Sequence, residues 1–450
     1  MTEKTLIRDE GSQVLRRLGN KALIGMMIVC STLEWMGVAA LFSASLSVLA
    51  IAAGCAGAFG LAFLSLLVTG KLNRMLKLLP SFAFALIGYI TLIVVTFIVY
   101  VINQSEMNII TRGISNTVYQ LLPLLLALGF AFMFGEDGIY YAFIGVAIAY
   151  GLVVLMTIRT FGLGTMIHDW FAMVRGGGDT KAVLALEKHT FVGGMGFFIY
   201  YFAINLKARK YTWIYLGVVM VITLLAFKRT LILSAFGSVA LYLILNKLEK
   251  IWGQRVARFV LYTTLAMLLL SCFLYLLMIK SGLFYQLVEE NGINTSSRAY
   301  IYKKYEKYYE LSFGYIGKGF GWVERNAKEI VGPNAPEALH NEILQLYIEL
   351  GGIGSTLFFV YFILGNTFLL DRRYGFAIGK LYGCMAVYMI TYSYIANGVL
   401  SWAISTAIWV CIMGATASAV NVDLFNNGTK SVKLQSSPPV DGKTDKKQKR

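Results

Sequence analysis

The residues of this chain best suited to chemistry are one histidine and the amide that follows it. His340, one of only three histidines, directly precedes Asn341 and the apolar run of "HNEILQLYIELGGIG". An imidazole titrates at about pH 6.5 when unperturbed, so at neutral pH it can accept a proton from a hydroxyl. The same histidine could instead bond to a loop carbonyl at a membrane surface, with Asn341 near a helix start. The residue types alone leave both interpretations open.

Four basic residues in predicted outer segments could bind an anion. Lys228 and Arg229 lie between two apolar runs, where a charge is costly unless a cavity, a counter-ion or snorkelling satisfies it. Arg298 and Arg175 are predicted to share the same outer face. A guanidinium stays charged, and its planar fork of donors suits phosphate oxygens. If these groups converge they would form a pyrophosphate clamp, with Lys228 in support.

The elements that must position these residues are membrane helices. The chain has 450 residues, of which 57% are hydrophobic and 14% charged, and its mean hydropathy is +0.65. A bilayer core of about 30 Å needs roughly 20 apolar residues per helix. The sequence predicts an all-α integral membrane protein with about twelve transmembrane helices. They begin near Ala22, Leu46, Pro80, Val118, Ile139, Lys188, Tyr211, Thr230, Phe259, Asn341, Lys380 and Trp402.

The placement of lysine and arginine predicts the orientation. With both termini in the cytoplasm, most of the net charge of +16 falls in cytoplasmic segments, as the positive-inside rule requires. The basic composition therefore reports topology and requires no nucleic-acid partner. We expect no cleavable signal peptide, because the polar start runs into a span long enough to remain as an anchor.

Four regions follow from this topology. Residues 1–280 are predicted to hold transmembrane helices 1–9, residues 281–340 a large, partly helical periplasmic loop, residues 341–420 helices 10–12, and residues 421–450 a disordered cytoplasmic tail. The large loop is rich in tyrosine, so it is expected to fold as a small cap, with a helix from about Arg298 to Leu311. Its aromatic rings would pack among themselves or line a sugar site.

Neither metal nor disulfide chemistry has a sequence signal. The five cysteines all lie in apolar segments, without zinc-ligand spacing. Glu289 and Glu290 are the nearest candidates for a cation site, and we expect none. The other notable acid is Glu34, in the middle of the first span.

The start of the tenth span has its own pattern. Pro336 and Glu337 predict a helix that begins just before His340 and continues into the membrane, so that His340 and Leu344 share one face. The glycines that follow would allow close contact between helices.

Several motifs together resemble the O-antigen ligase and polymerase superfamily of bacterial membrane glycosyltransferases. "HNEILQLYIELGGIG" is similar to that family's His-Asn helix start and its Glu-x-Gly-x-x-Gly pattern, matched at Glu349, Gly351 and Gly354. "KRT" at Arg229 and "SSRAYIY" at Arg298 are similar to the two arginine contexts of the family, and "IGKGFG" to its glycine-rich turn. Arg175 matches only loosely, and His189 has no counterpart.

The resemblance implies a fold of the GT-C type in the bacterial inner membrane, with the active site facing the periplasm. The donor would be a glycan on undecaprenyl pyrophosphate and the acceptor a glycan or lipid A-core. His340 would act as general base, Arg229 and Arg298 would hold the pyrophosphate, and Arg175, Lys228, Asn341 and Glu349 would contribute or support. Transfer would invert the anomeric centre and need neither a cofactor nor a metal. Other polysaccharide assembly proteins are expected partners.

Three alternative functions remain open. The motifs do not separate a polymerase, which extends one lipid-linked chain with another, from a ligase, which moves a finished polymer to lipid A-core; loop size slightly favours the polymerase. A lipid-linked sugar transporter would suit twelve spans, although transporters usually place polar groups near the bilayer midplane. A non-enzymatic scaffold for polysaccharide assembly is the third.

Overall fold

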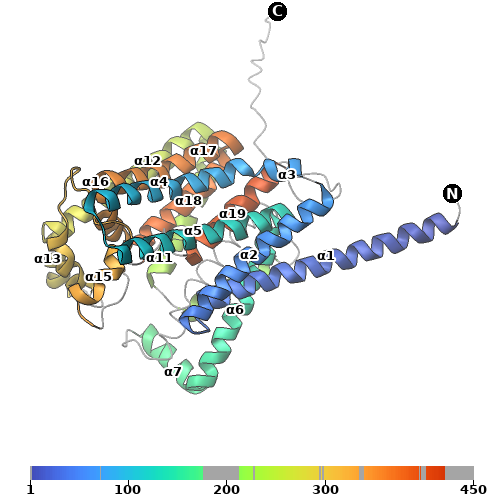
Figure 1. The fold of residues 1–450 in the computed structure, drawn as a ribbon, viewed down its shortest axis with the longest axis horizontal. Helices are drawn as coiled ribbons and strands as arrows, with labels where there is room; N and C mark the ends of the chain where they lie inside the picture. Colours follow the sequence, from blue (N-terminus) through green and yellow to red (C-terminus); the bar gives the residue numbers. More distant parts are fainter. Residues whose placement is uncertain are drawn as a thin grey trace, which may run out of the picture.

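The computed structural model describes residues 3–70, 72–175, 212–226, 229–292, 295, 298–333, 339–394, 396 and 402–420. All regular structure in these ranges is helical, and the helices pack side by side as a bundle (Figure 1). The protein is therefore an all-α integral membrane protein, as the sequence predicted.

The helices fall into two groups. Those of the bundle are α1 (Glu3–Val38), α2 (Ala44–Thr69), α3 (Leu72–Leu76), α4 (Leu79–Asn103), α5 (Met107–Phe134), α6 (Asp137–Phe161), α7 (Leu163–Val174), α10 (Thr212–Ala226), α11 (Arg229–Trp252), α12 (Gln254–Lys280), α16 (Glu342–Val360), η2 (Tyr361–Gly365), α17 (Asn366–Tyr374), α18 (Phe376–Ser393) and α19 (Trp402–Ala419). Those of the cap, residues 281–340, are α13 (Leu283–Glu290), α14 (Arg298–Tyr305), η1 (Glu306–Tyr308) and α15 (Trp322–Ile330).

The helices agree with eleven of the twelve predicted spans, and the sixth, near Lys188, lies outside the described residues. Eight helices in the described part of the chain are long and apolar enough to cross a membrane. The remaining three predicted spans coincide with α10, α18 and α19, which do not meet that criterion over the residues described.

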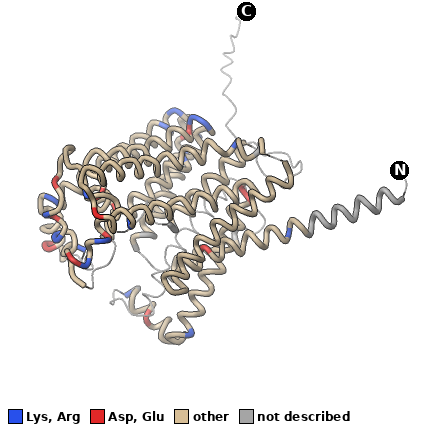
Figure 2. The backbone as a smooth tube through the Cα atoms, viewed as in Figure 1, with Lys and Arg blue, Asp and Glu red and all other residues tan. Residues whose placement is uncertain are grey.

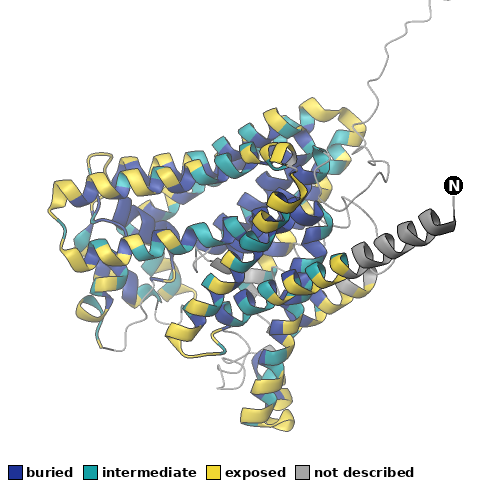
Figure 3. Cartoon of the chain, turned by 45° about the vertical axis from the view of Figure 1, so that its right-hand side comes forward, coloured by how far each residue is buried: buried dark blue, intermediate teal, exposed yellow. Residues whose placement is uncertain are grey.

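α5 is the most enclosed of the candidate spans, because it packs against α2, α4, α6 and α19. The outer helices instead expose apolar side chains on the surface of the bundle, among them Leu67 and Val68 of α2 and Phe97 of α4 (Figure 3). An apolar surface of this kind suits contact with lipid chains. The four buried cysteines and the half-buried Cys30 are all unpaired.

Two ion pairs join helices of the bundle. Near the start of α12, the Arg258 guanidinium lies 2.9 Å from the Asp371 carboxylate, and the buried Lys380 ammonium lies 2.6 Å from that of Glu249. A second set of charges lies on the cap, where α12 ends (Figure 2). Glu34, the mid-span acid, is buried and accepts a hydrogen bond from Thr406 of α19 at 2.8 Å.

The cap is attached directly to the end of α12. The Lys280 ammonium donates to the carbonyls of Glu306 and Tyr309, at 2.7 and 2.9 Å, and lies 4.7 Å from the Tyr309 ring centroid. The helix predicted from Arg298 to Leu311 is therefore shorter than expected: α14 ends at Tyr305, and one 3-10 turn follows. Lys280 binds the Glu306 carbonyl, which a helix that continued to Leu311 would use internally.

Candidate active site

The predicted general base, His340, lies just before α16, because this helix starts later than expected. Asn341 caps the helix, since its Oδ1 accepts a hydrogen bond from the Leu344 amide at 3.1 Å. His340 precedes the cap, exposed, with a φ of 54°. This left-handed conformation is uncommon for residues other than glycine, although histidine adopts it more often than most. His340 and Leu344 therefore do not share a helix face.

Three elements fix the backbone around His340. The Tyr302 hydroxyl of α14 donates to the His340 carbonyl at 3.3 Å. The side-chain amide of Asn341 donates to the Tyr275 hydroxyl of α12 at 3.3 Å. The Ser393 hydroxyl of α18 donates to the buried Glu342 carboxylate at 2.7 Å. His340 thus stands where α12, α14, α16 and α18 meet.

Arg298 belongs to the same group of residues. It begins α14 one turn before Tyr302, so the two side chains leave the same face of that helix. Burial raises the pKa of the Tyr302 phenol to about 12, and the positive charge of Arg298 lowers that pKa in part. Arg298 and His340 therefore both interact with the Tyr302 phenol. Arg298 acts through its charge, and His340 accepts a hydrogen bond at its carbonyl.

The glycine-rich turn of the cap is inserted into a break in α16. Gly351 has a φ of 76° and a ψ of −177°, so the helix is interrupted between its two halves. Lys318 and Gly319 donate their amides to the carbonyls of Ile348 and Glu349, at 2.9 and 2.8 Å, and Gly352 donates to Tyr315 at 2.8 Å. A Cβ on Gly351 would fall on the Tyr315 carbonyl. Only glycine fits, because the φ and the space both exclude a side chain.

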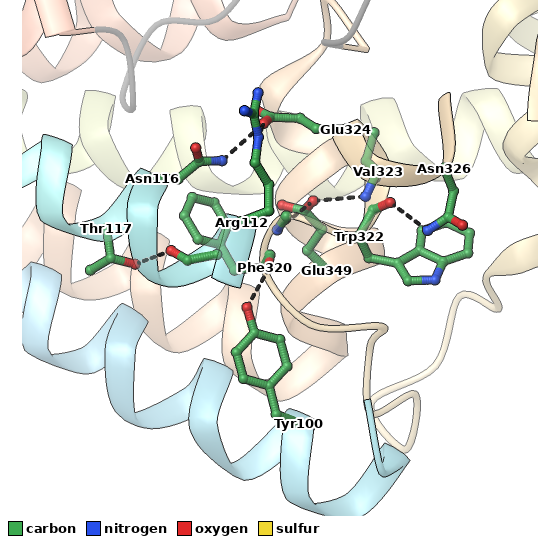
Figure 4. Close-up of polar contacts among 12 residues, drawn as sticks. Tyr100, Arg112, Asn116, Thr117, Phe320, Trp322, Val323, Glu324, Asn326 and Glu349 are labelled. Carbon is green, nitrogen blue, oxygen red and sulfur yellow. Dashed lines mark hydrogen bonds and ion pairs between the residues drawn. The ribbon is translucent and has the colours of Figure 1, made fainter. Parts of the chain in front are cut away.

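Glu349, predicted as a supporting residue, binds backbone amides at the end of this turn (Figure 4). Its Oε1 accepts hydrogen bonds from the amides of Gly321 and Val323, both at 3.0 Å. These amides lie at the start of α15, where a carboxylate is favourable. The Tyr100 hydroxyl of α4 donates to the Phe320 carbonyl in the same turn.

The other predicted site residues are not brought to His340 by the described structure. Arg229 begins α11, but its side chain lies outside what the structure describes, as do Lys228 and His189. Arg175 is exposed at the end of α7, which stands at the lower edge of Figure 1, apart from α13, α15 and α16.

Aromatic side chains of the cap pack on one another and on α16, and packing was one of the two expected outcomes. Tyr308 contacts Trp322 with ring centroids 5.4 Å apart, and Tyr315 stacks on Tyr347 at 5.6 Å. A cavity of about 390 Å³ remains beside them, lined by Tyr308, Tyr309, Tyr315, Lys307 and other residues. The close contact predicted for Gly354 is present with Val95 of α4.

Sequence reasoning missed the residues that hold the site together. Tyr302 could have been found, because it lies four residues after Arg298 on a predicted helix. Tyr275, Ser393 and Lys280 carry no local signal, since their partners are distant in the chain. Among the described residues, no group of three or more histidine, cysteine or acidic side chains is placed to hold a metal ion.

Fold and site together define a multi-pass helical membrane protein with a folded cap over one end. Residues 214–359, which run from within α10 to within α16 and include the cap, match the family model for O-antigen ligase. This match supports membership of the O-antigen ligase and polymerase superfamily, whose members are glycosyltransferase-like enzymes that act on lipid-linked glycans. A comparison with curated proteins found no match.

Proposed function

We propose that the protein transfers a glycan from a pyrophosphate-linked polyprenyl carrier, undecaprenyl pyrophosphate, to an acceptor hydroxyl at the periplasmic face of the bacterial inner membrane. The observation that supports this most is the junction at Tyr302. It holds a histidine in an exposed, left-handed conformation and places a guanidinium on the adjoining helix.

His340 acts as the general base in this proposal. A neutral imidazole takes the proton of the acceptor hydroxyl as the oxygen attacks the anomeric carbon, and the bond to the carrier pyrophosphate breaks. Attack from the side opposite the leaving group inverts the anomeric centre. The bonds to Tyr302 and Asn341 fix the backbone on both sides of the imidazole, which limits its movement relative to the acceptor.

Arg298 stabilises the leaving group. Negative charge grows on the pyrophosphate as its bond to the sugar breaks, and a fixed guanidinium lowers the energy of that transition state. Arg229 is the further arginine of this proposed clamp, with Lys228 in support, whereas the position of Arg175 at the end of α7 does not support its predicted part in the clamp. The three cations supply the charge that a divalent cation otherwise provides, so the reaction as proposed needs no metal.

Within the family we favour a polymerase, with a glycan as acceptor, because the large aromatic cap offers surface for a second sugar chain. The ligase, with lipid A-core as acceptor, is the alternative. In a deletion strain, chains of one repeat on the final lipid would support a polymerase. A bare core with polymer left on the carrier would support a ligase.

The catalytic proposal is tested on the purified, reconstituted protein with a lipid-linked glycan and its acceptor. His340→Gln is expected to lower kcat by about 10²- to 10⁴-fold, the usual contribution of a general base. His168→Gln is the matched control, since His168 is exposed on α7, and it is expected to retain activity. Activity of His340→Gln within a few-fold of wild type would exclude the base.

A second pair of variants tests the clamp. Arg298→Gln is expected to lower kcat/KM by about 10²- to 10³-fold, as the loss of a group that stabilises developing charge does. Lys303→Gln removes an exposed charge from the same helix and is expected to be neutral. Equal activity of the two variants would remove Arg298 from the mechanism.

A further inference from the structure

A pocket that the proposed mechanism does not use lies where the cap meets α5. It has a volume of about 170 Å³ and is lined by Arg112, Glu324, Arg325 and Lys328. Arg112 lies near the start of α5, and the other three residues lie on α15. Arg325 and Lys328 are three positions apart and exposed, so they line the same side of that helix.

The pocket carries excess positive charge. Its single carboxylate is already engaged, since Glu324 Oε2 lies 2.8 Å from Arg112 Nε and accepts from the Asn116 amide at 2.9 Å (Figure 4). Three cations face one acid, which favours an anion between them. The planar donor groups of arginine are particularly suited to phosphate oxygens.

The walls of the pocket are held rigidly. Gly113, next to Arg112, packs so closely on the cap that a Cβ would meet the Tyr100 hydroxyl and the Phe320 carbonyl. A Cβ on Gly321 would lie 2.9 Å from the Gly113 nitrogen. With Glu349 bound to Gly321 and Val323, this contact fixes α15 against the first turns of α5. Such preorganisation lowers the entropy cost of binding.

The pocket is expected to lie near the level of lipid headgroups. α5 begins at Met107, and its residues Met107, Ile114 and Val118 form an exposed apolar stripe, 73%, 57% and 53% accessible. Arg112 follows Met107 by five residues, or about 7 Å of helix. A basic side chain this close to the end of an apolar span lies where phosphates of the membrane surface are found.

From this geometry we propose that the pocket binds the headgroup phosphate of an anionic membrane phospholipid. The site is separate from the proposed catalytic residues. Glu349, which adjoins the pocket through Val323, lies about 12 Å along α16 from Asn341. The bound lipid would clamp α15 to α5 and so steady the cap.

The test measures binding of phosphatidylglycerol and phosphatidylcholine to the full-length protein by native mass spectrometry. Wild type is expected to prefer phosphatidylglycerol. The double variant Arg325→Gln, Lys328→Gln is expected to bind it about 25-fold more weakly, since each lost charge near a membrane surface contributes about fivefold. Lys303→Gln, Lys304→Gln removes two exposed charges of α14 and is expected to bind as wild type does.

Two further measurements make the result decisive. The swap Arg325→Lys, Lys328→Arg keeps both charges and is expected to retain the lipid, which separates loss of charge from misfolding. Inorganic phosphate is expected not to displace the lipid. Equal binding of phosphatidylglycerol by wild type and the Gln double variant would overturn the proposal, and displacement by inorganic phosphate would overturn the lipid as its occupant.

Discussion

The break in α16 makes a strong prediction about Gly351. Replacing it with alanine is expected to detach the glycine-rich turn of the cap, because the φ of 76° and ψ of −177° are available only to glycine. The Cβ would also meet the Tyr315 and Ile316 backbone. The chain would return towards a continuous helix, which closes the gap that the turn occupies.

The cost can be worked out from the contacts. Backbone strain of this kind costs about 1–3 kcal/mol. The three hydrogen bonds between the turn and the two halves of α16 contribute about 1 kcal/mol each. The free energy that keeps residues 315–319 docked in the break of α16 should therefore fall by about 4–6 kcal/mol.

Hydrogen exchange read by mass spectrometry measures this quantity directly. Peptides that contain the amides of Lys318 and Gly319 are expected to exchange about a thousandfold faster, or more, since each tenfold corresponds to about 1.4 kcal/mol. Gly237→Ala is the matched control. Gly237 lies exposed in α11 with no atom within 4 Å of the added carbon, so the change should stabilise that helix by up to about 1 kcal/mol. Unchanged protection of Lys318 and Gly319 in Gly351→Ala would refute this account.

Three further predictions concern the capping residue, the orientation and the mid-span acid. Asn341→Ala is expected to cost about 1 kcal/mol of stability, because the helix cap is lost, and to lower transfer activity. Asn341→Ser can still cap the helix and is expected to restore most of both, as measured by thermal unfolding and by turnover. Equal turnover of the two variants would show that capping by residue 341 does not affect transfer. A membrane-impermeant maleimide is expected to label Lys303→Cys in intact cells and Arg255→Cys only after permeabilisation, and the reverse pattern would invert the topology. Glu34→Gln is expected to leave glycan transfer unchanged, because the amide oxygen can accept the same hydrogen bond from Thr406. A large loss of turnover, with normal membrane insertion, would show that the Glu34 carboxylate is needed for transfer.

Much of the fold could be predicted because membrane helices have a strong local signal. Each long apolar run became a helix wherever the structure describes it, since lipid leaves backbone groups few other ways to bond. The start of α16 was predicted to within a few residues. It was misplaced because Asn341 is the cap and His340 lies outside the helix, a difference decided by one side-chain bond to Leu344.

The contacts of the site were beyond prediction because they join distant parts of the chain. Arg112 and Glu324 are separated by 212 positions, and Asn103 reaches the Gly317 carbonyl across 214. No local pattern reports such pairs. The interruption at Gly351 was missed for the same reason: Gly351 and Gly352 were interpreted as a surface for a neighbouring helix, as Gly354 is, whereas a segment of the cap occupies the space beside them.

The insertion of the cap into α16 also limits how this protein can be re-engineered. The chain from Tyr315 to Val323 enters the gap at Gly351 and leaves it at fixed points, so a deletion or added residue there would shift every later contact out of register. Chimaeras that exchange caps between relatives would have to carry Glu349 to Gly352 with them as one module. Length variation is better accommodated near Gly332, whose added carbon meets no atom within 4 Å.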